Sequence, residues 1–117
     1  MNSSDLLLAL HQEASKRAYV VRLEVLDWTA SLIKVRLYIS PDLFIQVYRN
    51  DNQDTTNLVL IHNGQRLFAR DKLGGMWHRH TAIEPDLHNG SPEGRESVTL
   101  AGFLDEVEII LAEMGLP

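Results

Sequence analysis

Residues 32–71 read LIKVRLYISPDLFIQVYRNDNQDTTNLVLIHNGQRLFARD, a stretch in which apolar and polar side chains alternate along several short runs. Alternation with a period of two is typical of half-buried β-strands, because successive side chains of a strand point to opposite faces of the sheet. Turn-forming residues at 40–42 and 50–54 separate the runs. The stretch therefore predicts consecutive strands over 32–39, 43–49, 55–62 and 65–71.

The dipeptide Asn63-Gly64 joins the last two of these runs. It is the strongest short hairpin signal, because a type I′ turn needs a positive φ at both central residues. Regular pairing outward from this turn gives the facing pairs Ile61–Arg66, Val59–Phe68 and Asn57–Arg70. We therefore expect both arginines on the same face of the hairpin.

Two segments with helical spacing flank the strands. Residues 4–17 follow Ser3 or Ser4, either of which can cap a helix. The apolar side of this helix is Leu6, Leu7, Leu10 and Ala14. A second helix follows a cap at Ser97 or Thr99 and ends at Gly115. Its apolar stripe is Leu100, Phe103, Leu104, Val107, Ile110, Leu111 and Met114.

Two further strands complete the expected elements. Residues 19–26 alternate, with Val21, Leu23 and Val25 on the buried side, and DWTAS then forms a turn. A short strand over 76–81 interrupts an otherwise irregular stretch that is rich in proline and glycine. The predicted fold class is α+β, in which an antiparallel five- or six-stranded meander sheet has the N-terminal and C-terminal helices packed on one face. Residues 1–117 fit one domain of this kind.

Composition limits the functions that are open to this chain. It contains no cysteine, which excludes disulfides, thiolate metal sites and a cysteine nucleophile. The N-terminal segment lacks a basic region and a long apolar run, so we expect neither a signal peptide nor a membrane span. We therefore expect a cytoplasmic protein. The formal net charge of −5 means that nucleic-acid binding needs positive charge gathered in one place.

The face of the sheet that the helices leave open is one such place. Its side chains on the second and third strands are Lys34, Arg36, Tyr38, Phe44, Gln46 and Tyr48, and we expect Arg66 and Arg70 to join them. A surface that is both cationic and aromatic is suited to contact phosphates and to stack on bases. The alternative is an ordinary solvated sheet face, since antiparallel sheets commonly expose such residues to water.

Three of the five histidines, His78, His80 and His88, lie close together in the sequence. With a nearby carboxylate they could hold zinc or another divalent metal. They could equally act without metal in RNA cleavage, where one imidazole takes the 2′-hydroxyl proton and another protonates the leaving oxygen. A third interpretation is that they are loop histidines with no chemical role.

The order of landmarks resembles the TumE-like family of small prokaryotic proteins, which includes toxins of toxin–antitoxin systems. The residues that carry the resemblance are YRNDNQDTTNLVLIHNGQRLFARD, GGMWHRH, EPDLHNGSPEGRE and TLAGFLDEVEIIL, within residues 20–112. The resemblance implies an α+β fold, growth inhibition through RNA cleavage and a DNA-binding antitoxin as partner protein. It matches Trp77, His78, His80 and His88 to the family's histidine region, and Arg66, Arg70 and Asp71 to the preceding strand.

These observations lead to one functional hypothesis and two alternatives. The hypothesis is a TumE-like toxin with endoribonuclease activity, and no cofactor is needed for it. Its predicted catalytic residues are His78, His80, His88, Arg70 and Arg79. Its predicted substrate-binding residues are Arg36, Tyr48, Arg66 and Trp77. The alternatives are a non-catalytic protein-binding module of the same fold and a divalent-metal protein with His78, His80 and His88 as ligands. An unpaired edge strand would also favour a homodimer.

Overall fold

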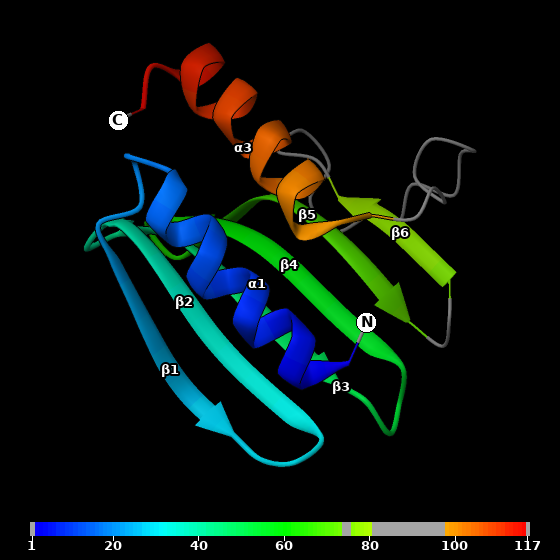
Figure 1. The fold of residues 1–117 in the computed structure, drawn as a ribbon. Helices are drawn as coiled ribbons and strands as arrows, with labels where there is room; N and C mark the ends of the chain where they lie inside the picture. Colours follow the sequence, from blue (N-terminus) through cyan, green and yellow to red (C-terminus); the bar gives the residue numbers. More distant parts are fainter. Residues whose placement is uncertain (1, 74–75, 81–97, 117) are drawn as a thin grey trace.

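The computed structural model describes residues 2–73, 76–80 and 98–116. Its elements in chain order are α1 (Ser3–Lys16), β1 (Arg22–Trp28), β2 (Leu32–Ser40), β3 (Leu43–Asn50), β4 (Thr55–His62), β5 (Gln65–Leu73), β6 (Met76–His80) and α3 (Leu100–Met114). The six strands form one antiparallel sheet with the order β1-β2-β3-β4-β5-β6, so every strand pairs with its neighbour in the chain (Figure 1). The predicted meander and its sixth strand are confirmed.

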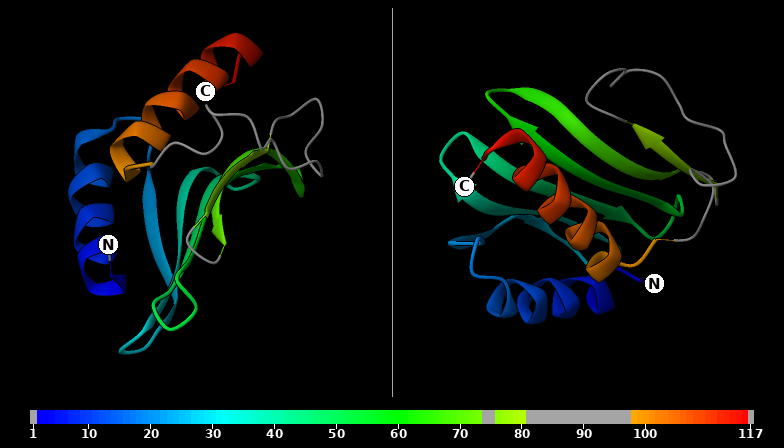
Figure 2. Two further views of the ribbon diagram at one scale, coloured as in Figure 1. Left: turned by 90° about the vertical axis from the view of Figure 1, so that its right-hand side faces the viewer. Right: turned by 90° about the horizontal axis from the view of Figure 1, so that it is seen from above.

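Both helices lie on the same face of the sheet, as predicted (Figure 2). Between them and the sheet lies the apolar core, and its largest fully buried side chains include Phe68, Phe103, Leu6, Leu10, Ile33, Leu37, Ile45, Leu58, Leu60 and Leu104. Each side chain of this size contributes roughly 1.5–3 kcal/mol relative to an exposed one. Met114 is an exception to the predicted stripe, with 47% of its surface exposed. It is the last residue of α3, where a side chain has few neighbours.

The helix ends match the expected chemistry, with one correction. Thr99 caps α3, and its hydroxyl accepts a hydrogen bond from the backbone N–H of Gly102 at 3.0 Å. Gly115 ends α3 in the left-handed conformation, with φ +67°. The cap of α1 is Asn2 rather than Ser3 or Ser4. Ser3 is instead buried, and both its backbone N–H and its hydroxyl donate to Asp51, each at 2.9 Å.

The β4–β5 hairpin begins as predicted and then departs from the expected register. Asn63 and Gly64 both have positive φ, as a type I′ turn requires, and Ile61 faces Arg66. A bulge next to this pair then inserts Leu67 as one extra residue on β5. The pairs beyond it are Leu60–Phe68, Val59–Ala69, Leu58–Arg70 and Asn57–Asp71, so the predicted pairs Val59–Phe68 and Asn57–Arg70 are wrong.

The physical reason for this bulge is the burial of Phe68. Shifting a strand by one residue moves its side chains to the other face of the sheet. In the observed register Phe68 is buried and stacks on Phe103 of α3, with 5.5 Å between ring centroids. The same shift carries Arg70 to the helix-covered face.

Strand β1 lies further along the chain and is more exposed than expected, since it begins at Arg22 rather than at residue 19. It continues through Asp27 to Trp28, where a turn was predicted, and a second bulge lies between Val25 and Asp27. Leu23 packs against the core, but Val21 and Val25 are exposed. The reason is that β1 is the outermost of the described strands on its side of the sheet, and β2 is its one neighbour among them. Neither helix described by the structure is long and apolar enough to cross a membrane.

Candidate functional site

The face of the sheet opposite the helices, called the open face below, carries interlocked cationic, aromatic and amide side chains. Arg36 donates to the amide oxygen of Gln46 at 3.1 Å and to the Tyr38 hydroxyl at 3.3 Å. Its guanidinium lies over the Phe44 ring at 4.5 Å, and that ring packs against Tyr38 at 5.4 Å between centroids. Arg22 of β1 covers the Tyr38 ring at 4.3 Å. Cross-strand packing therefore holds these groups in place.

A shallow hollow of about 260 Å³ lies in the middle of this face. Its lining residues are Lys34, Gln46, Tyr48, Asn57 and Val59. The amide oxygen of Asn57 is buried and accepts no hydrogen bond from any described residue. Buried polar atoms normally have a partner, so this oxygen is available to a donor that enters from outside. The hollow thus combines a cation, a phenol and two amides above an apolar valine.

The structure separates the two arginines that were expected to share this face. Arg66 faces Ile61, on the open side of the hairpin. Arg70 lies on the helix-covered face with only 6% of its surface exposed, and it forms an ion pair with Glu106 of α3 at 3.4 Å. The expectation that Arg70 joins Arg36 and Tyr48 is therefore wrong. The Leu67 bulge, which has no clear mark in the sequence, causes the difference.

The predicted histidine strand does form, next to β5. In the β5–β6 ladder His78 pairs with Asp71, Arg79 with Arg70 and His80 with Ala69. His88 lies outside the described residues. Among the residues described, no group of three or more histidines, cysteines or carboxylates could hold a metal ion. The metal-binding alternative needs His88, so it stays a prediction.

Asp71, which the family resemblance matches to the strand before the histidines, was not among the predicted catalytic or substrate-binding residues. It is buried and its backbone lies opposite that of His78. The ladder therefore puts a carboxylate-bearing residue and a histidine at paired positions of neighbouring strands. Only the register of β5 against β6 reveals it, since neither residue's neighbours in the sequence indicate the pairing.

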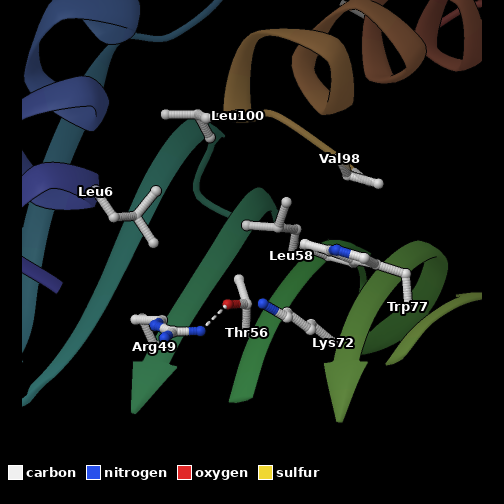
Figure 3. A pocket seen from close by; sticks show the side chains of 8 residues that line it. All are labelled: Leu6, Arg49, Thr56, Leu58, Lys72, Trp77, Val98 and Leu100. Carbon is white, nitrogen blue, oxygen red and sulfur yellow. Dashed lines mark hydrogen bonds between the residues drawn. The ribbon is translucent and has the colours of Figure 1, made fainter. Parts of the chain in front are cut away.

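A second concave site lies on the other side of the sheet, and we call it the helix-side pocket (Figure 3). It has a volume of about 200 Å³. Its lining residues are Leu6, Arg49, Thr56, Leu58, Lys72, Trp77, Val98 and Leu100. Trp77, predicted to bind substrate, therefore lines this pocket, on the opposite side of the sheet from Arg36 and Tyr48.

Two carboxylates outside the helix-side pocket balance its cations. Arg49 donates to Asp51 and to Asp54, each at 3.0 Å, and Lys72 donates to Asp54 at 3.1 Å. Hydrogen bonds from Lys72 and Arg49 lower the pKa of Asp54 below its ordinary value. Burial alone would raise the pKa of Asp51, but hydrogen bonds from Ser3 and Arg49 outweigh it, and the net effect is a lowered pKa. Both carboxylates are thus charged at neutral pH.

Comparison with family models, with curated proteins and with solved structures gives no match for this chain. The functional proposals below therefore rest on the chain's own residues and their arrangement.

Proposed function

We propose that this protein is a TumE-like toxin that acts on RNA and binds a single strand across the open face of the sheet. The observation that carries the proposal is the open face, with its cations, its tilted pair of aromatic rings and the hollow lined by two amides. Single-stranded RNA is recognised by such groups: cations contact phosphates, rings stack on bases, and amides bond to base edges. Arg36, Tyr48 and Arg66 keep their proposed substrate-binding roles on this face.

The spacing of the strands links this surface to the histidines. Strands β3 and β6 are three strand spacings apart, which is about 14 Å. An RNA strand that contacts Tyr48 on β3 therefore reaches β6 within a few nucleotides. In the proposed reaction, one imidazole of the pair His78 and His80 removes the proton of a ribose 2′-hydroxyl. The 2′-oxygen then bonds to phosphorus, and the other imidazole protonates the 5′-oxygen as its bond to phosphorus breaks.

In the proposal Lys34 and Arg36 of β2 bind backbone phosphates of the RNA strand that lies across the open face, and Arg70 does not bind phosphate. Because Arg70 is paired with Glu106 on the covered face, its role in the proposal is to hold β5 against α3. The proposal also places the protein in the cytoplasm, together with RNA and a cognate DNA-binding antitoxin.

Induced expression in a host tests the activity. Wild type is compared with a variant that carries both His78→Ala and His80→Ala, and total RNA is examined after induction. We expect growth arrest and RNA fragmentation with the wild type and neither with the variant, at equal protein levels. A wild type that leaves growth unaffected and shows no affinity for single-stranded RNA at low salt contradicts the proposal.

One observation favours the alternative of a non-catalytic protein-binding module. Strand β1 is an unpaired edge that exposes Val25, Leu26 and Trp28, the last with 65% of its surface exposed. Exposed apolar edge strands commonly pair with another chain. Under this alternative, Leu26→Lys abolishes the complex with the antitoxin or a second copy, whereas changing both histidines to alanine leaves it intact. Size-exclusion chromatography of the co-expressed proteins distinguishes these outcomes.

A further inference from the structure

The helix-side pocket has the features of a small-molecule site that the RNA proposal does not use. It lies on the face of the sheet opposite the hollow, between α1, α3 and strands β3 to β6 (Figure 3). Its volume of about 200 Å³ is that of roughly seven water molecules at about 30 Å³ each. A ligand for this pocket is therefore small.

The apolar part of the pocket is rigid. Leu6, Leu58 and Leu100 are almost completely buried and belong to the core, so their positions are fixed by packing. Trp77 packs partly buried against the same core and contributes an aromatic ring. These walls suit a flat apolar group, since indole rings stack favourably on other aromatic rings.

The polar ends of Arg49, Thr56 and Lys72 lie together at one side of the pocket (Figure 3). Arg49 is 93% buried, at 7% relative exposure, and it donates through Nε to Asp51 and through Nη1 to Asp54 and Thr56. A guanidinium has five N–H donors, and Nη2 of Arg49 donates to no described residue. Lys72 has three donors and forms one described ion pair, with Asp54. Both cations thus keep unused donors beside an apolar cavity.

We propose that the helix-side pocket binds a small aromatic monocarboxylate. The carboxylate accepts hydrogen bonds from Arg49 Nη2, from Lys72 and from the Thr56 hydroxyl, and the ring lies between Trp77 and the leucines. Arginine and lysine together with a hydroxyl form charge-assisted bonds to a carboxylate, and these bonds are strong where water is excluded. The proposal does not depend on the RNA proposal, because the two sites share no residue and lie on opposite faces.

Asp54 provides a specific test of the proposal, because it competes with the ligand's carboxylate for Arg49 and Lys72. Its carboxylate bonds to both cations from outside the pocket, so it already offsets the positive charge that would attract an anion. Removing the charge of Asp54 while keeping the shape of the side chain should therefore strengthen binding of the ligand. Asparagine suits this position, since Asp54 has a φ of +47° and asparagine tolerates that conformation.

The test uses phenylacetate, with phenylacetamide as an uncharged analogue of the same shape. Both are titrated into the full chain carrying Trp28→Phe, so that the indole N–H resonance of Trp77 is the only one from tryptophan. We expect phenylacetate to shift this resonance with an affinity at least tenfold higher than that of phenylacetamide. Equal affinities, or no shift with either compound, overturn the proposal.

Two variants and a control then test whether the charges of Lys72 and Asp54 determine the affinity for phenylacetate. Lys72→Met should weaken phenylacetate binding about tenfold, and Asp54→Asn should strengthen it several-fold. Lys16→Met removes one positive charge from an exposed position at the end of α1 and should leave the affinity unchanged. Thermal unfolding first shows that each variant is folded at the temperature of the titration. Weaker binding by Asp54→Asn, or equal losses from Lys72→Met and Lys16→Met, contradicts the proposed site.

Discussion

The arginines on the two faces of the sheet have different neighbours. On the covered face Arg49 is paired with Asp51 and Asp54, Arg70 with Glu106, and Arg17 with a cluster of carboxylates on α1 and α3. On the open face Arg36 bonds, among the described residues, to the neutral groups of Gln46 and Tyr38. Positive charge on the covered face is thus balanced inside the fold, whereas Arg36 can still neutralise a ligand's charge.

This difference bears on the formal charge of −5. Asp51 and Glu106 join the helices to the sheet, Asp54 joins β3 to β5, and the carboxylates around Arg17 join the two helices. An overall acidic chain can therefore keep a locally cationic surface. The net charge alone does not decide whether the open face binds RNA.

The assignment of residues to faces is tested most severely by Phe68→Ala. Since Phe68 is fully buried and stacks on Phe103, the free energy of unfolding should fall by about 3–5 kcal/mol in urea denaturation. Leu67→Ala, at the neighbouring bulged position, serves as the control and should cost clearly less. A cost below about 1 kcal/mol for Phe68→Ala would mean that the ring faces solvent and that the bulge is absent.

Matched changes of two arginines separate the covered face from the open face. Arg70→Met leaves the partly buried Glu106 without this cation, and we expect the free energy of unfolding to fall by about 1–3 kcal/mol. Arg36→Met removes the guanidinium that lies over Phe44 and bonds to Gln46 and Tyr38, but these contacts are only partly buried, so stability should change by about 1 kcal/mol or less. Thermal and urea unfolding of both variants measure the difference. Equal destabilisation would show that both arginines serve only structure.

Binding measurements with a short labelled single-stranded RNA sharpen the same comparison. Arg36→Met should weaken binding roughly tenfold at low salt and reduce the slope of log affinity against log salt by about 0.7. The matched control is Lys16→Met, which removes an equal charge from α1 and should leave both quantities unchanged. Equal effects of the two variants would indicate a response to net charge rather than binding on the open face.

Acid pH should affect stability through the covered-face carboxylates. The pKa of Asp51 is lowered in the folded chain by the bonds from Ser3 and Arg49, so below the ordinary aspartate pKa of about 3.9 the unfolded chain takes up more protons. The stability that Asp51 contributes is present above that pH and is lost as the pH falls through the lower, folded-state pKa. We expect the thermal midpoints of wild type and Asp51→Asn to differ most at neutral pH and to converge toward pH 3. If the difference between the two thermal midpoints stayed the same at every pH, the substitution would act through the shape of the side chain rather than through its charge.

Local patterns were sufficient to predict most of the fold. The alternation in residues 32–71, the Asn63-Gly64 turn and the Thr99 and Gly115 caps all act within a few residues, and the structure agrees with each. The Leu67 bulge could not be predicted in this way, because it is favoured by the burial of Phe68 against Phe103 on a distant helix. The prediction put Arg70 on the wrong face of the sheet because it did not include that bulge.

The candidate site was predictable only in part for the same reason. Alternation alone places Arg36 and Tyr48 on the open face. The pairing of Asp71 with His78 requires the β5–β6 register, and the helix-side pocket joins Leu6, Arg49, Lys72 and Leu100 from four separate elements. No spacing within the chain encodes such contacts.

The agreement between strand order and chain order also has a consequence for folding kinetics. Each strand meets a partner that follows it directly, so the meander forms through short loops with a small entropic cost of closure. The bond between Arg17 and Asp105 instead joins residues 88 positions apart. We therefore expect the hairpins to form early and the docking of α1 against α3 to be a late step, visible as slower acquisition of amide protection in both helices.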